Sequence, residues 1–121
     1  MNKGRKISGG RYHKLRKKKL CELNGQERKV KLGKEKRKTL KVKGGYKKSV
    51  LLFNEIANVL DKKSGKTKKV KIKNVLETPS NKFLARQNII TKGSIIETEL
   101  GRARVSNRPS QEGSINAELL D

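Results

Sequence analysis

The residues of this chain that are best suited to chemistry are lysines placed at every second position. Residues 40–43 read Leu-Lys-Val-Lys, and residues 69–73 read Lys-Val-Lys-Ile-Lys. On a β-strand this alternation places the lysines on one face, about 7 Å apart, and the apolar residues on the other. That interval is close to the phosphate spacing along a nucleic-acid strand. An ordinary solvated sheet face is the alternative, but solvated faces usually mix charges of both signs, and residues 36–48 contain no Asp or Glu.

Residues that could hold a metal or act as a nucleophile are too few to form a site. His13 is the only histidine and Cys21 the only cysteine, so one chain cannot assemble a tetrahedral zinc site or a Cys-His-acid nucleophile. Glu97 and Glu99 share one face of an expected strand, but no other acid or base accompanies them. They are better explained as the acidic outer side of a hairpin that contains Arg102 and Arg104.

A short motif, Gly65-Lys66-Thr67, is similar to the end of a phosphate-binding loop. The full pattern requires a glycine five residues before Gly65, and that position is Leu60. A hairpin turn explains the motif better. The sequence therefore predicts no enzyme, no cofactor and no metal site, and it shows no small-molecule substrate site.

The positive charge is concentrated in the first half of the chain. Residues 1–50 hold twenty Lys and Arg against three Glu, whereas residues 76–121 hold six basic and six acidic side chains, within a whole-chain net charge of +22. Such an excess favours a polyanionic partner, because each phosphate contact releases condensed counterions. Aromatic residues make up only 3% of the chain, too few for a base-stacking platform. Recognition of the nucleic-acid backbone is therefore favoured over recognition of bases.

The first 24 residues are expected to form a basic arm. They include glycines and a Lys/Arg run but no sustained apolar period, so the arm is predicted to be disordered alone and ordered by RNA. A short amphipathic helix over residues 12–23 is the alternative. No apolar run reaches the ~18 residues of a membrane helix, and no secretory signal follows the basic start. We expect an intracellular chain with no membrane partner and with Cys21 as a reduced thiol.

The remaining residues, 25–121, have the pattern of short strands joined by glycine-centred turns. Alternation predicts inward Leu40 and Val42, and inward Val70 and Ile72. Residues 49–60 could form one bent strand or a strand and a short helix, and residues 82–88 a single helical turn with a Ser or Asn cap. Residues 94–120 should form a three-stranded meander. The fold class expected is all-β, a small barrel of about six short strands with an extended basic N-terminal arm.

Several longer stretches resemble one known family. These stretches are SGGR at 8–11, EKRKTLKVKGG at 35–45, ANV at 57–59, SGKTKKVKI at 64–72 and the run 88–120. They are similar to the small-subunit ribosomal protein S8e family, in its short archaeal form. The resemblance implies a β-barrel core, a basic N-terminal extension and a structural role on small-subunit ribosomal RNA beside neighbouring ribosomal proteins, in the cytoplasm. A ribosome-assembly factor and a DNA-binding architectural protein remain alternatives.

Charge, strand geometry and this resemblance together define the expected RNA-binding residues. The arm and strand cations would neutralise phosphates, and two glycines in the arm would let the backbone approach RNA closely, because glycine has no side chain. The expected set is Arg5, Lys6, Gly9, Gly10, Arg11, Lys14, Arg16, Lys17, Lys18, Lys19, Lys38, Lys41, Lys43, Lys47, Lys48, Lys69, Lys71, Lys73 and Arg86.

Overall fold

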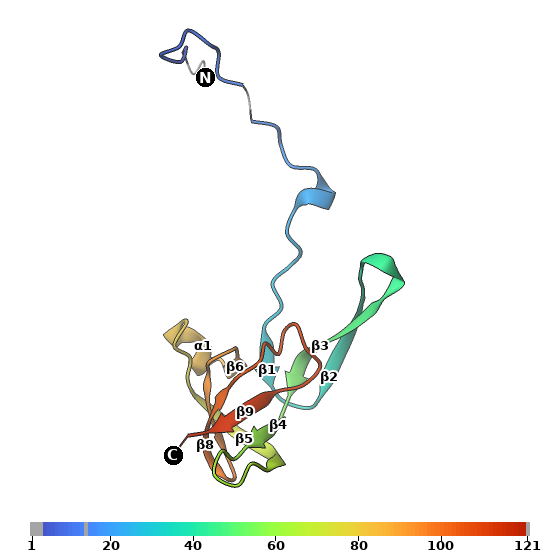
Figure 1. The fold of residues 1–121 in the computed structure, drawn as a ribbon, viewed down its shortest axis with the longest axis vertical. Coiled ribbons are helices and arrows are strands. Elements are labelled where there is room, and N and C mark those ends of the chain that lie inside the picture. Colours follow the sequence, from blue (N-terminus) through green and yellow to red (C-terminus); the bar gives the residue numbers. More distant parts are fainter. Residues whose placement is uncertain (1–3, 14, 121) are drawn as a thin grey trace.

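The computed structural model describes residues 4–13 and 15–120 and shows an all-β protein, which confirms the predicted fold class (Figure 1). The described part contains nine strands, one short α-helix and two 3₁₀ turns, at Leu20–Glu22 and Lys43–Gly45. The strands and helix, in order, are β1 (Val30–Leu32), β2 (Lys36–Lys41), β3 (Lys47–Asn54), β4 (Ile56–Leu60), β5 (Thr67–Glu77), α1 (Lys82–Arg86), β6 (Ile89–Ile90), β7 (Ile95–Thr98), β8 (Gly101–Val105) and β9 (Asn116–Leu119).

The second half of the chain closes into the predicted barrel. Its five strands run in the order β4-β5-β7-β8-β9, and β4 pairs with β9 in parallel to close it. Strands β7, β8 and β9 are successive antiparallel neighbours, so the predicted meander is confirmed. Val70 and Ile72 are buried while the lysines between and beside them are exposed, as the alternation predicts. The period of two holds because the closed barrel covers only one face of β5.

Four strands lie outside the barrel, in a second sheet of order β2-β3-β1-β6. A single barrel for residues 25–121 was therefore an incomplete expectation. The two-residue strand β6 is too short for periodicity to reveal. Residues 49–60 pass from the second sheet into the barrel as two strands, β3 and β4, broken only at Glu55. Asn54, which is buried, accepts a hydrogen bond from the Ile56 amide through its side-chain oxygen (3.1 Å) at this break.

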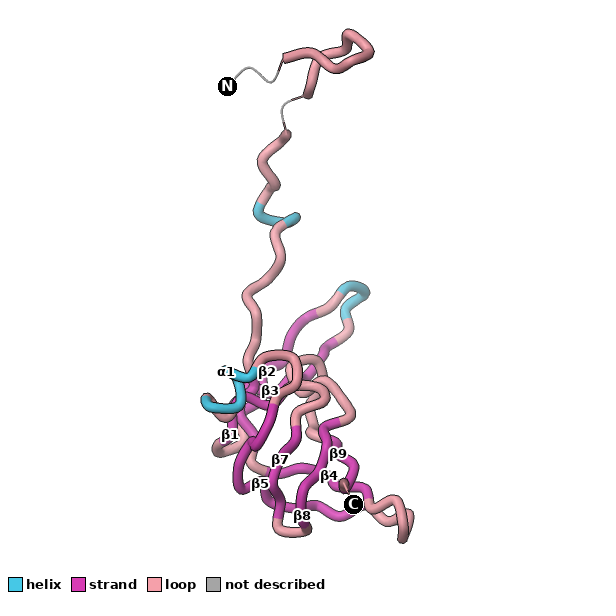
Figure 2. The backbone as a smooth tube through the Cα atoms, turned by 90° about the vertical axis from the view of Figure 1, so that its left-hand side faces the viewer, coloured by secondary structure: helices cyan, strands magenta, loops and turns pink. Residues whose placement is uncertain are grey.

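The hairpin β2-β3 departs from the prediction that Leu40 and Val42 point inward. No residue of β2 is buried, and Val42 lies beyond the end of the strand, 48% exposed. The reason is that the far end of the hairpin projects from the body without a covering layer on either face (Figures 1 and 2). Gly44 and Gly45 both have φ of 78° in its turn, a conformation that side-chain-bearing residues rarely adopt.

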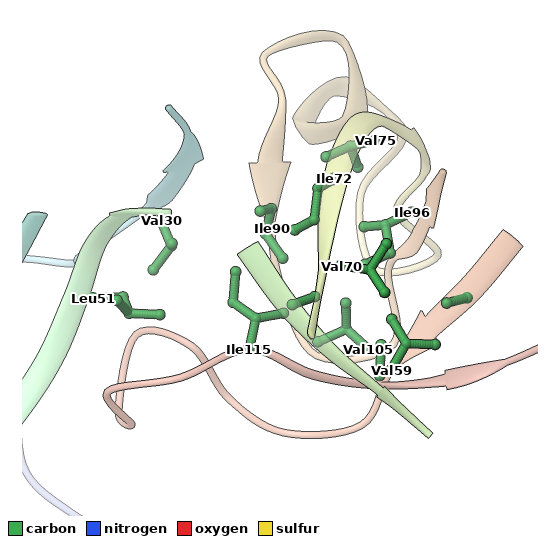
Figure 3. Close-up of a cluster of buried hydrophobic side chains, with 13 residues drawn as sticks. Val30, Leu51, Val59, Val70, Ile72, Val75, Ile90, Ile96, Val105 and Ile115 are labelled. Atoms are coloured by element: carbon green, nitrogen blue, oxygen red, sulfur yellow. The ribbon is translucent and has the colours of Figure 1, made fainter. Parts of the chain in front are cut away.

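One hydrophobic core joins the barrel to the second sheet. Val30 and Leu51, from the second sheet, face the barrel residues, and Ile115 lies between the two groups (Figure 3). All three side chains are almost fully buried. The barrel and the sheet from which the hairpin projects therefore share one core.

The described residues before β1 run away from the body as an extended arm (Figures 1 and 2). Regular structure there is limited to the 3₁₀ turn at Leu20–Glu22 and one bridge between Arg5 and Arg11. The alternative prediction is an amphipathic helix over residues 12–23. The described residues of that range contain no α-helix. Across the described part of the chain, no helix has the length and apolar character needed to cross a membrane.

Candidate nucleic-acid interface

The outer end of the arm folds into a small loop that displays cations. The Lys6 amide donates to the Gly10 carbonyl (2.8 Å), and the Gly9 amide donates to the Lys6 carbonyl (2.9 Å). The Arg5 guanidinium also donates to the Gly9 carbonyl (3.1 Å). Gly9 has φ of +81°, so the turn itself requires glycine there. The loop holds Arg5, Lys6 and Arg11 together, all exposed.

Further along the arm, one arginine is partly neutralised within the chain. Arg16 forms an ion pair with Glu22 (2.8 Å), and the other carboxylate oxygen of Glu22 accepts from the Lys19 amide (3.0 Å). The Arg16 guanidinium, and then the Lys19 amide, lower the pKa of Glu22 below its ordinary value. Lys17, Lys18 and the side chain of Lys19 are exposed on the same stretch. Lys14, another residue of the expected set, lies outside the described residues.

The hairpin β2-β3 with its turn, residues 36–48, carries seven Lys and Arg and no acidic residue, and we call it the lysine hairpin. Lys41 lies directly opposite Lys47 across the two strands, and Leu40 lies opposite Lys48. Like charges in directly opposed positions repel each other, so this pair destabilises the free hairpin. Lys43 was expected on the strand beside Lys41, but it lies in the 3₁₀ turn at the tip. Its charge is therefore displayed at the hairpin's end instead of along its face.

Two cations of the lysine hairpin have partners elsewhere in the chain. Lys48 is half-buried, and its ammonium donates to the side-chain oxygen of Gln111 (2.6 Å). Arg37 forms an ion pair with Glu35 in the preceding turn. Lys48 and Arg37 thus have partners within the chain, while Lys38, Lys41 and Lys43 are exposed.

The lysines of β5 form a row on the outer surface of the barrel. Lys69, Lys71 and Lys73 are all exposed, and Lys71 lies 3.6 Å from the Glu55 carboxylate. Lys69 and Arg37 of the lysine hairpin both line one hollow of about 130 Å³. The row therefore begins beside the base of the lysine hairpin, although 32 positions separate these two residues in the sequence.

Arg86 stands apart from the other expected residues, at the end of α1. Asn81 caps this helix by accepting from the Phe83 amide (3.0 Å), which confirms the predicted capped helical turn. The Arg86 guanidinium lies 6.0 Å from the centre of the Phe83 ring, and that ring is 68% exposed. A cation over an exposed aromatic ring is a surface that can contact a base or sugar.

The arrangement brings two basic elements to one side of the molecule. The arm and the lysine hairpin leave the body in the same general direction, and both views show this (Figures 1 and 2). Within the described part of the chain, no group of three or more His, Cys, Asp or Glu side chains could hold a metal ion. The chemistry available on this side is the binding of negative charge.

The chain is similar to known proteins over nearly its whole length. The family model described as ribosomal protein S8e matches residues 1–120, nearly the whole chain. This chain belongs to the ribosomal protein S8e family. Small ribosomal subunit protein eS8 of Methanocorpusculum labreanum is 47% identical over 117 residues, which cover 97% of this chain and 94% of that protein. The eS8 proteins of Methanosphaerula palustris and Haloarcula marismortui are 41% and 40% identical over the same shares.

For this S8e chain, sequence reasoning missed cations that only the fold brings together. A hollow of about 350 Å³ where the arm enters the body is lined by Arg28, Lys29, Lys92 and Arg108. Lys92 and Arg108 lie in the C-terminal third, whose charges sum to zero, so the distribution of charge along the sequence did not indicate them. Lys36 and Arg37, at the base of the lysine hairpin, were also absent from the expected set, although the unbroken run of basic residues at 36–38 was a usable signal.

Proposed function

We propose that this chain is a structural constituent of the small ribosomal subunit and binds ribosomal RNA through the arm, the lysine hairpin and the β5 row. The observation that carries the proposal is the direct opposition of Lys41 and Lys47 in an exposed hairpin. A pair that repels in the free protein becomes favourable when a phosphate backbone lies against it.

The arm would act differently from the hairpin. Its loop at residues 5–11 and the cluster of residues 16–19 present cations along an extended chain that has little contact with the body (Figure 1). Such a segment can lie between RNA helices and neutralise phosphates that otherwise repel each other. Fixing its backbone costs conformational entropy, and counterion release with charge-assisted hydrogen bonds offsets that cost.

The proposed role is non-catalytic and located in the cytoplasmic ribosome. The family match and the similarity to eS8 proteins over nearly the whole chain support it. Small-subunit RNA is the proposed main partner. Neighbouring ribosomal proteins are proposed for the surface formed by residues 76–121, because this part holds six basic and six acidic side chains and lacks the excess of positive charge that would reserve it for RNA.

Binding to small-subunit ribosomal RNA across a salt series tests the proposal. We expect the logarithm of affinity to fall steeply and linearly with the logarithm of salt concentration, by about 0.7 to 0.9 per phosphate contact. An affinity independent of salt would contradict the electrostatic account.

Two further measurements separate the alternatives. Duplex DNA of equal length should compete poorly with small-subunit RNA, and equal competition would favour a DNA-binding architectural protein. The chain should also sediment with mature small subunits. Its presence on precursor particles alone would favour an assembly factor.

A further inference from the structure

The hollow where the arm enters the body has the features of an anion-binding pocket, and none of the residues that define it belongs to the expected RNA-binding set. Its walls come from residues 25–30, residues 89–92, residues 108–111 and one side chain of α1. These segments are distant in sequence. The pairing of β1 with β6 brings residues 25–30 beside residues 89–92, and the Leu51 amide of β3 donates to the Pro109 carbonyl (3.3 Å), which holds residues 108–111 nearby. The pocket is therefore a product of the fold, unlike the arm and the lysine hairpin.

The charge of the pocket lining is strongly unbalanced. Arg28, Lys29, Lys92 and Arg108 line it, and Glu27 is the only acidic residue among the lining side chains. The nearest acid of the 106–115 loop, Glu112, does not line the pocket. Its carboxylate instead accepts a hydrogen bond from the side-chain amide of Asn107 (2.7 Å). Four cations against one acid around a single hollow create a positive potential that attracts an anion.

Arg28 supplies the most specific observation. Its Nε atom is buried and has no hydrogen-bond partner among the described residues. A buried donor without a partner is costly, and such groups are rare in folded proteins. An acceptor bound in the pocket, which Arg28 lines, would remove this cost once the side chain turns its Nε–H toward it. Arginine also presents its donors in a planar fork that matches the oxygens of a phosphate.

The size of the pocket and its other walls indicate more than a single free ion. A volume of about 350 Å³ lies in the range of sites that hold small organic groups, roughly 300 to 1,000 Å³. Val30, Ile89 and Ile90 form an apolar part of the lining. A phosphodiester with its attached sugar offers both the charge for the cations and an apolar face for these side chains.

We propose that this pocket binds one phosphodiester unit of the RNA strand that the arm also contacts. The pocket lies at the root of the arm, and Gln111 on its rim accepts the hydrogen bond from Lys48 of the lysine hairpin. RNA held between the arm and the hairpin passes this point. The inference rests on the proposed RNA binding and adds to it a built site at which the strand is held in a fixed position.

Substitution of the pocket arginines in the full chain tests the proposal, with a fragment of small-subunit ribosomal RNA as the probe. Arg28→Gln and Arg108→Gln should each lower RNA affinity about tenfold, since a hydrogen bond to a charged group is lost. Each should also reduce, by about 1, the magnitude of the salt slope, which is the slope of the logarithm of affinity against the logarithm of salt concentration. The double variant should lose less binding free energy than the two single variants lose together, because both side chains hold the same phosphate.

Arg102→Gln is the matched control, because it makes the same chemical change at an exposed arginine on the barrel, away from the pocket lining. It should change affinity by less than about threefold, through long-range charge alone. Arg28→Lys should keep the salt slope but lower affinity, because lysine keeps the charge and lacks the fork.

Thermal unfolding without RNA separates binding from folding. Because the Arg28 Nε has no partner in the free protein, Arg28→Met should leave the Tm unchanged or raise it. A clear fall in Tm would assign Arg28 a structural role and overturn the proposal. If wild-type protein binds the RNA and the two pocket variants behave like Arg102→Gln, the pocket proposal fails alone. If the wild type fails to bind, the proposed function itself fails.

Discussion

The barrel and the lysine hairpin are built from the same alternation of apolar and basic residues, yet their apolar side chains differ in burial. In β5 Val70, Ile72 and Val75 are buried and the lysines are exposed, whereas in β2 no residue is buried. The difference is the layer on the other side: the barrel closes over one face of β5, and nothing covers the end of the hairpin (Figure 1). Alternation therefore predicts a strand without predicting its burial.

This comparison also separates the residues that stabilise the fold from those that contact a partner. The buried core lies in the barrel and the adjoining parts of the second sheet, where residues such as Ile96 and Leu51 have no exposed surface. The exposed cations of the arm and hairpin lie away from it, and two of them, Lys41 and Lys47, face each other. Stability and binding should then respond to different substitutions.

Removal of residues 1–24 should give the largest effect and the clearest separation of binding from stability. Affinity for small-subunit RNA should fall by at least about a hundredfold, and the magnitude of the salt slope should fall by several units, since each phosphate contact contributes about 0.7 to 0.9. The Tm should not change, because the described arm residues contribute nothing to the core. RNA filter binding and calorimetry measure the two quantities.

A chain whose arm has the same composition in a shuffled order is the control for that deletion. If charge alone matters, its affinity should equal that of the natural arm. A marked loss with the shuffled arm would show that the loop at residues 5–11 recognises a particular RNA shape.

Truncation of one apolar side chain in each region should give the next largest effect. Ile96→Ala, in the barrel core, should lower the free energy of unfolding by about 2 to 5 kcal/mol, through lost burial and the cavity left behind. Val42→Ala, in the lysine hairpin, should change it by no more than about 0.5 kcal/mol, as for other exposed positions. Urea unfolding followed by circular dichroism measures both. Equal losses would show that the hairpin packs on the body in solution.

The same contrast explains how much could be predicted from the sequence. The barrel strands, the meander and the capped turn of α1 follow from period two, glycine positions and a local Asn81 cap, and all of these are short-range signals. The second sheet depends on pairing between β1 and both β3 and β6, which no local pattern reveals.

The candidate site divides in the same way. Cations of the arm and the lysine hairpin are dense in sequence, so composition alone indicates them. Lys92 and Arg108 are isolated cations in a neutral region, and they meet Arg28 only because the fold places three separate segments around one hollow. A site of that kind requires the structure, because its members share no spacing.

Reversal of one charge in the lysine hairpin should give a smaller effect. It should raise the stability of the free protein and lower its affinity for RNA. Lys47→Glu converts the repulsive pair with Lys41 into an attractive one, and it should stabilise the free protein by roughly 0.2 to 1 kcal/mol. RNA affinity should fall at least about tenfold, because one phosphate contact becomes repulsive. Lys66→Glu, in the β4-β5 turn, is the control and should change RNA affinity much less. Loss of stability with Lys47→Glu would contradict the assigned register.

The smallest expected effect compares two carboxylates, one in the arm and one in the barrel. Arg16 lowers the pKa of Glu22, and Lys62, which lies 2.8 Å from Glu118, lowers the pKa of that residue; the ordinary value for both is 4.5. A carboxylate whose pKa is lower in the folded state than in the unfolded state stabilises the protein at pH values above the ordinary pKa. This stabilisation is lost as pH falls through the folded-state pKa. Both side chains are exposed, so the change in stability should be slight.

Carbon-detected NMR titration of the free protein measures these two pKa values directly. Both should lie below 4.5, and Arg16→Gln should raise only the pKa of Glu22 toward its ordinary value, while Lys62→Gln should raise only that of Glu118. The pair also tests the arm itself, because the Glu22 shift requires the 3₁₀ turn at Leu20–Glu22 to be formed without RNA. An ordinary pKa for Glu22 beside a lowered one for Glu118 would mean that the turn forms only when RNA binds. The barrel would then be the part of the chain that is ordered before binding, and the arm the part that RNA orders.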